Sequence, residues 1–115
     1  IGADGLGLIS YSLAGLEVAH CDDLACTGVT YEHLGTHEGN SSLAIDDSGY
    51  GLISVSPTSS DLTVIRCHNA DCSRTTLNTL EGVEGRSVAI GADGLGLVSG
   101  RSGNDLTVVH LPYGY

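Results

Sequence analysis

Residues 90–99 read IGADGLGLVS and residues 1–10 read IGADGLGLIS, so one decapeptide opens the chain and returns near its end with a single Val/Ile difference. A diverged copy, IDDSGYGLIS, occupies residues 45–54. A fixed period is the signature of a repeat architecture, in which each repeat is one small supersecondary unit. Copies that begin at residues 1, 45 and 90 predict a period of 44 to 45 residues.

The similarity between the copies continues beyond the decapeptide. Residues 16–21 (LEVAHC), 62–67 (LTVIRC) and 106–111 (LTVVHL) fall in register, and a Cys-x4-Cys pair ends this segment in the first two copies. We therefore expect one repeat domain over residues 1–115. It is divided into two full repeats and a truncated third, at residues 1–44, 45–89 and 90–115.

The composition favours β structure. The chain has 17 Gly and no Trp, Met or Phe, and Leu, Val, Ile and Ala supply most of its apolar content. Such residues suit short strands and tight turns. Asp-Gly or Ser-Gly between apolar segments is a strong hairpin signal, and it occurs at residues 4–5, 48–49 and 93–94. The sequence therefore predicts an all-β fold.

A full repeat is expected to hold four short antiparallel strands. Neighbouring apolar positions such as Leu52 and Ile53 predict that the second and third strands are buried on both faces, whereas the fourth is more polar. Burial that falls from the first strand to the fourth is typical of a β-propeller blade, with a sandwich or a solenoid as alternatives. The first strand of the repeat is expected at residues 42–45 and 87–90, and the second at 7–11, 51–55 and 96–99. The third is expected at 16–21, 62–67 and 106–111, and the fourth at 27–34 and 74–80.

The pattern ADGxGLIS…DLxVxxC…C resembles the tandem repeats of secreted, propeller-like bacterial and archaeal proteins, and the resemblance covers the whole chain. It implies a blade architecture and an extracellular location, but no catalytic signature, because a fold does not fix a function. Single-chain propellers have at least about four blades. This chain is expected to form about two and a half β-propeller-like blade repeats, each of four antiparallel strands. Oligomerisation therefore has to complete the propeller.

Charge and hydropathy exclude several classes of partner. The chain carries 14 Asp and Glu against four Arg and no Lys, for a net charge of −10, whereas nucleic acids and anionic membranes require a basic surface. No apolar run approaches the roughly 20 residues that span a bilayer. The chain starts at Ile1 without an export leader, as expected of a mature secreted, extracellular protein, although a trimmed chain would begin in the same way.

Four cysteines form two pairs with the same spacing and the same place in their repeats. We expect the disulfides Cys21–Cys26 and Cys67–Cys72, because small exported domains use disulfides where their cores are thin. A zinc site built from the two Cys-x4-Cys pairs is the alternative.

Other polar residues offer little chemistry. His20, Arg66 and His110 are equivalent positions, but the arginine does not suit a metal shared between repeats, so no metal is expected. Residues 46–49 (DDSG) offer oxygens for calcium, yet the single carboxylate in the other copies favours a plain turn. No nucleophile, base and acid stand at a recognisable spacing. We therefore expect no enzyme activity, no catalytic residue and no cofactor.

Two features of the sequence concern carbohydrate. Asn40 begins an Asn-Ser-Ser glycosylation acceptor in a loop. The alternative function is a lectin-like propeller of two or three chains that binds a glycan between blades, where repeated polar loops offer multivalency. Sugar sites usually use a stacked aromatic ring, but there is no Trp, and Tyr11 and Tyr50 are not equivalent.

The leading functional hypothesis is self-assembly. The first copy keeps only Ile1 of its first strand and the third copy lacks its fourth, so we expect two unlike open β edges. Open edges pair with other chains, and unlike edges join head to tail, into a ring or a filament. The protein is thus expected to be a secreted structural subunit that forms an extracellular filament or tube with copies of itself. The expected assembly edge comprises Gly7, Leu8, Ile9, Leu106, Val108, His110, Tyr113 and Tyr115.

Overall fold

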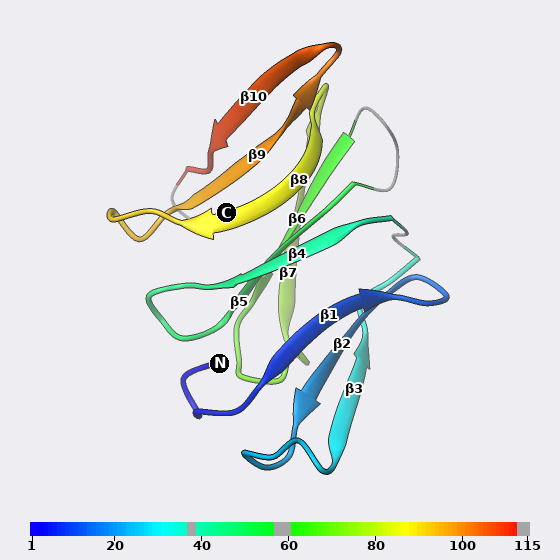
Figure 1. The fold of residues 1–115 in the computed structure, drawn as a ribbon, viewed down its shortest axis with the longest axis vertical. Helices are drawn as coiled ribbons and strands as arrows, with labels where there is room; N and C mark the ends of the chain where they lie inside the picture. Colours follow the sequence, from blue (N-terminus) through cyan, green and yellow to red (C-terminus); the bar gives the residue numbers. More distant parts are fainter. Residues whose placement is uncertain (37–38, 57–60, 113–115) are drawn as a thin grey trace.

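The computed structural model describes residues 1–36, 39–56 and 61–112, which form three antiparallel sheets (Figure 1). Each strand pairs with its neighbours in chain order. Sheet 1 holds β1 (Leu8–Ser12), β2 (Leu16–Cys21) and β3 (Val29–His33). Sheet 2 holds β4 (Ser41–Ile45), β5 (Gly51–Val55), β6 (Asp61–Cys67) and β7 (Thr75–Glu81). Sheet 3 holds β8 (Glu84–Ile90), β9 (Gly96–Ser102) and β10 (Asp105–His110).

The all-β expectation is confirmed. The described residues contain no helix and no closed barrel, and every expected strand is present within a few residues of its expected place. The tandem copies are offset from the sheets, because residue 45, where the second copy starts, is the last residue of β4. No helix in the described ranges is long and apolar enough to cross a membrane.

The three copies of the opening motif form the same turn. Gly5, Gly49 and Gly94 adopt φ angles of 76°, 85° and 78°, a left-handed conformation that glycine enters without a steric penalty. In each turn the N–H of this glycine bonds the carbonyl three residues earlier, at 2.9 to 3.0 Å. Local sequence alone therefore explains why the motif reverses the chain in all three repeats.

The core lies between the sheets, which are stacked along the longest axis of the molecule (Figure 1). Side chains alternate along β5, so Ile53 packs with Leu16 and Val18 of sheet 1 in one cluster. Leu52 packs with Val88 and Val98 of sheet 3 in another. Sheet 2 is thus covered on both faces, which explains its consecutive apolar residues.

Burial departs from the expected gradient. β5 and β6 are buried on both faces as expected, but β4 is only half-buried, so burial peaks at the second and third strands rather than at the first. β1 and β10 are largely exposed on one face. They belong to sheets 1 and 3, each of which has a described neighbour on one side only.

Candidate functional site

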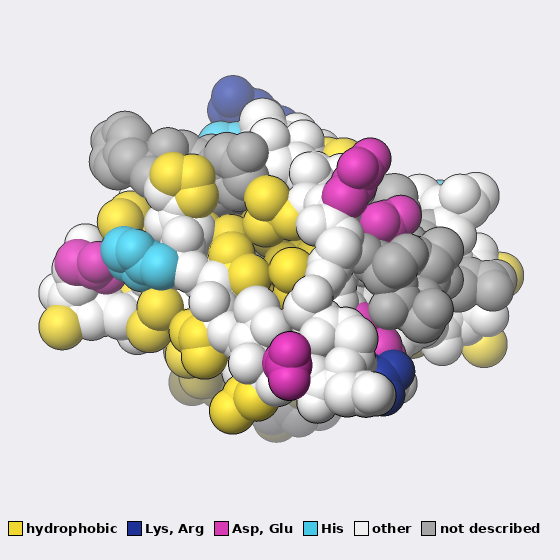
Figure 2. Space-filling view, turned by 90° about the horizontal axis from the view of Figure 1, so that it is seen from above, with side chains coloured by type: hydrophobic (Ala, Val, Ile, Leu, Met, Phe, Trp, Pro, Cys, Tyr) yellow, Lys and Arg dark blue, Asp and Glu magenta, His cyan; other side chains and the backbone are white. Residues whose placement is uncertain are grey.

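The outer faces of sheets 1 and 3 present apolar side chains to solvent. In sheet 3 this face includes Leu106 and Val108 of β10, which are 84% and 63% exposed. In sheet 1 it includes Ile9, which is 52% exposed, and Tyr31. Figure 2, which looks down on the sheet 3 end, shows hydrophobic side chains gathered in the middle of that face between acidic ones. We call these surfaces outer face 1 and outer face 3.

Equivalent residues in other repeats show what the exposed positions do when a neighbouring sheet is present. Ile53 and Val98 correspond to Ile9, and both are 0% exposed. Leu16 and Leu62 correspond to Leu106 and are also 0% exposed, while Val18 and Val64, the equivalents of Val108, are 0% and 1% exposed. The same residue types are thus buried wherever another sheet packs against them.

The expected assembly residues do not all share one environment. Ile9, Leu106, Val108 and His110 are exposed and lie on the outer faces. Leu8 points the other way and packs against the cluster between sheets 1 and 2. Gly7 lies just before β1 and is half-buried, and its carbonyl accepts a hydrogen bond from the N–H of Cys21. Tyr113 and Tyr115 lie outside the described residues.

The four cysteines form the two expected pairs, Cys21–Cys26 and Cys67–Cys72. Each disulfide closes the loop that follows the third strand of its repeat, and Cys67 and Cys72 belong to the core between sheets 1 and 2. No cysteine is free, so the thiolates that the zinc alternative requires are not available. Within the described residues, no group of three or more His, Cys, Asp or Glu side chains is placed to hold a metal ion.

Two histidines at equivalent positions bind an aspartate of the turn in their own repeat. Nε2 of His20 lies 2.7 Å from Oδ2 of Asp4, and Nε2 of His110 lies 2.7 Å from Oδ2 of Asp93. The N–H of the residue two places beyond each aspartate donates to Oδ1, and this bond, followed by the histidine, lowers the pKa of both carboxyls. These pairs hold the turn against the third strand.

The middle repeat replaces this arrangement with a more buried one. Nη1 of Arg66 lies 2.8 Å from Oδ2 of Asp46, and the side chains are only 19% and 4% exposed. Oδ1 of Asp46 accepts from the N–H groups of Ser48 and Tyr50 at 2.9 and 3.1 Å. Asp46 thus fixes its own turn and binds the third strand of its repeat.

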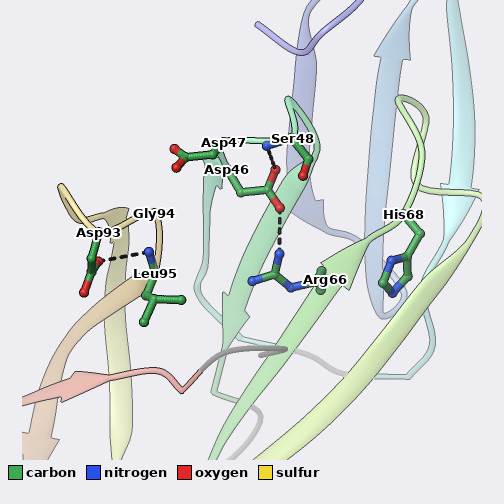
Figure 3. Close-up of a pocket in the computed structure, with 8 residues that line it drawn as sticks. All are labelled: Asp46, Asp47, Ser48, Arg66, His68, Asp93, Gly94 and Leu95. Carbon is green, nitrogen blue, oxygen red and sulfur yellow. Dashed lines mark hydrogen bonds and ion pairs between the residues drawn. The ribbon is translucent and has the colours of Figure 1, made fainter.

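A polar pocket of about 370 Å³ lies between the turns of the second and third repeats (Figure 3). Asp46, Asp47, Arg66 and His68 line it from the second repeat, and Asp93 with residues 94–95 from the third. Figure 3 shows the Asp46–Arg66 pair between the turn of Asp93 to Leu95 on one side and His68 on the other. The pocket offers acceptors for a ligand rich in hydroxyl groups, but the described residues that line it include no Tyr or Trp ring on which a sugar could stack.

The outer faces also carry polar contacts that the sequence pattern did not predict. On outer face 3, Glu84 binds Arg86 and Arg101, each at 2.8 Å, so this cluster has one surplus positive charge. On outer face 1, Tyr11 donates to Glu17 at 2.7 Å, and this bond raises the pKa of Tyr11 to about 12. The strand register brings Arg101 to Glu84 and Glu17 to Tyr11, because each pair joins two different strands, whereas Arg86 lies on the same strand as Glu84.

Asn40 is exposed and immediately precedes β4. Comparison with protein-family models, with curated proteins and with solved structures gives no match to this chain.

Proposed function

We propose that this chain is a secreted structural subunit that assembles head to tail with copies of itself into an extracellular filament or tube. The observation that carries the proposal is the exposure of Ile9, Leu106 and Val108 at positions whose equivalents are buried between sheets. In the assembly, one further copy would cover outer face 1 and another would cover outer face 3. In this proposal each sheet acts as a propeller-like blade, which agrees with the repeat resemblance.

The proposed contact joins the two outer faces rather than two strand edges. The exposed apolar side chains project from the faces of sheets 1 and 3, whereas the edges of β1 and β10 offer only backbone groups at the margin of such a contact. Because outer face 1 and outer face 3 differ, the contact is heterologous and propagates along a chain of subunits unless it closes into a ring.

Charge supports this pairing of faces. The Glu84 cluster on outer face 3 has one surplus positive charge, while Glu17 on outer face 1 is negative. The net charge of −10 on each chain opposes association. Salt shortens the reach of this repulsion to about 8 Å at physiological ionic strength. Assembly is therefore expected to increase with salt.

The apolar contacts make each joint weak on its own. Full burial of an aliphatic side chain contributes about 1.5–3 kcal/mol, whereas association costs roughly 4–15 kcal/mol of translational and rotational freedom. Three such side chains bring these terms close to balance. Assembly should therefore depend steeply on protein concentration. In this proposal the secreted subunit polymerises where it accumulates, outside the cell.

The disulfides support the proposed extracellular location. Both pairs form within one repeat and one of them lies in the core. Structural disulfides persist in oxidising compartments and are rare in the cytosol. An exported subunit would thus keep the cross-links that a small core needs.

The second candidate is a closed ring that binds a glycan. It is favoured by the number of sheets, since two chains would bring six, within the usual range of about four to eight propeller blades. The polar pocket between the second and third repeats would then lie between adjacent blades. This function stays second because the described pocket lining includes no Tyr or Trp ring on which a sugar could stack.

Sedimentation velocity and negative-stain microscopy of the 115-residue chain test the proposal, at protein concentrations up to about 1 mM and salt from about 0.01 to 1 M. Filaments or tubes that lengthen with salt support it. A discrete ring of two or three chains instead supports the second candidate, to be followed by a glycan array. A folded 11.7 kDa monomer under every condition overturns both.

Matched variants connect the assembly to the outer faces. Val108→Asp places a charge on outer face 3 and should abolish assembly while the monomer stays folded, because Val108 is already exposed. Leu77→Asp is the control. Leu77 is also an exposed apolar strand residue, but it belongs to sheet 2 and so lies on neither outer face. Equal assembly of the two variants would contradict the face contact.

A further inference from the structure

We propose that the joint between copies repeats the register of the contacts between sheets within one chain. In this joint Ala92 of one copy packs against Gly5 of the next, and Leu97 packs over Gly7. The inference rests on the proposed head-to-tail assembly and specifies which residues meet. It follows from two series of close approaches that recur at equivalent positions.

The first series joins successive turns. A Cβ atom added to Gly49 would overlap the Cβ of Ala3, and one added to Gly94 would overlap the carboxylate of Asp47. Ala3 and Asp47 occupy the third place of the first and second repeats, and Ala92 is their equivalent in the third. The third residue of each turn thus packs on the glycine of the following turn.

A hydrogen bond reinforces the first of these contacts. The N–H of Ala3 donates to the carbonyl of Gly49 at 2.8 Å, so the two turns approach as closely as paired backbone segments do. Such an approach leaves no room for a side chain at the receiving residue. Glycine at the fifth place of the repeat therefore serves both the left-handed turn and the contact with the preceding repeat.

The second series joins the second strands. A Cβ atom on Gly51 would lie 3.0 Å from Cδ2 of Leu8, and one on Gly96 would lie 2.7 Å from Cδ2 of Leu52. Each leucine comes from the preceding repeat and covers the glycine that begins the next second strand. Leu97 is the equivalent leucine of the third repeat, and it is half-buried on outer face 3.

The receiving glycines of the first repeat lack this cover. A Cβ atom on Gly5 would meet none of the described atoms within 4 Å, although Gly5 has the same left-handed φ, 76°, as its equivalents. A Cβ atom on Gly7 would meet only Cys21 of its own repeat, at 2.9 Å from Sγ. Ala92, the expected partner of Gly5, is exposed. Both halves of the turn contact are therefore accessible at opposite ends of the stack.

Gly5→Ala is the sharpest test, because the added methyl group meets open space in a single chain but would collide with Ala92 in the joint. Gly82→Ala is a matched control: Gly82 also has a positive φ, 84°, and its added Cβ likewise has no described neighbour within 4 Å. The two variants should lose similar stability from backbone strain. In sedimentation velocity, Gly5→Ala should associate at least about tenfold more weakly than Gly82→Ala.

Ala92→Leu tests the other side of the same contact. It also provides the test if Gly5→Ala does not fold. Ala92 is exposed in one chain, so a larger side chain should weaken association without altering thermal unfolding. If the wild-type chain assembles and Ala92→Leu, Gly5→Ala and Gly82→Ala all associate equally, the proposed register is wrong but the proposed function stands. A wild-type chain that stays monomeric overturns the proposed function and this inference with it.

Discussion

Nη1 of Arg66 donates to Oδ2 of Asp46 at 2.8 Å, and this ion pair stands where the first and third repeats each have a histidine bound to an aspartate. The carboxylate has moved two places along the turn, from the position of Asp4 to that of Asp46, and serine occupies the place it left. The turn is therefore bound to the third strand in every repeat, by different residues.

Breaking the middle pair should destabilise the fold. Asp46→Gly removes an almost buried carboxylate and leaves its partner guanidinium and two turn N–H groups without it, at a cost of about 3 kcal/mol. Asp46→Gly combined with Ser48→Asp and Arg66→His installs the arrangement of the other repeats, and should recover most of this loss. Urea unfolding with disulfides intact measures both; a triple variant no more stable than Asp46→Gly would show that the arrangements are not interchangeable.

The turn aspartates predict a loss of stability in acid. Hydrogen bonds from the turn N–H, followed by His20 or His110, lower the pKa of Asp4 and Asp93 below the ordinary 3.8. A group with a lowered pKa in the folded state stabilises the fold above the unfolded-state pKa, and this contribution disappears as the pH falls through the folded-state value. The melting temperature should therefore decline below about pH 4.

Neutral variants test the origin of this acid sensitivity. In Asp4→Asn/Asp93→Asn the decline of melting temperature in acid should be shallower, but not absent, because the pKa values of Asp23 and Asp71 are also lowered. An unchanged slope would assign the sensitivity to other carboxyls.

The two disulfides should differ in their rates of reduction. Cys26 is exposed, whereas Cys67 and Cys72 are both 1% exposed within the core. Thiol–disulfide exchange requires access of the attacking thiolate to sulfur. Limited reduction by a thiol, followed by alkylation and mass spectrometry, should label Cys21 and Cys26 first. Simultaneous labelling of all four would mean that global unfolding precedes reduction.

Crowding the contact between sheets 2 and 3 should be costly. A Cβ atom on Gly96 would lie 2.7 Å from Cδ2 of Leu52 and 2.8 Å from Cδ1 of Leu111. Gly96→Ala is expected to lower the free energy of unfolding by about 1–3 kcal/mol through overpacking. Gly103→Ala, where the added atom meets no described neighbour within 4 Å, is the control and should lose only what its positive φ costs. An unchanged free energy of unfolding in Gly96→Ala would mean that sheets 2 and 3 move apart enough to admit the added methyl group.

Local patterns in the sequence determined the elements of the fold. Asp-Gly and Ser-Gly marked the three turns because only glycine adopts their left-handed φ without penalty. Alternating and consecutive apolar residues located the strands, since side chains point to opposite faces of a sheet. The matched Cys-x4-Cys spacing gave the disulfide pairs, because the loop it closes is the same in both repeats.

Only the tertiary structure decided which of the repeated residues are buried. Ile9 and Ile53 are the same residue in the same motif, yet one is half exposed and the other fully buried, because burial depends on whether a neighbouring sheet covers that face. The Arg66–Asp46 pair and the Glu84 cluster likewise depend on strand register, which brings together side chains from separate strands and turns. The repeats thus specify each sheet, whereas the stacking order decides which faces remain available for a partner.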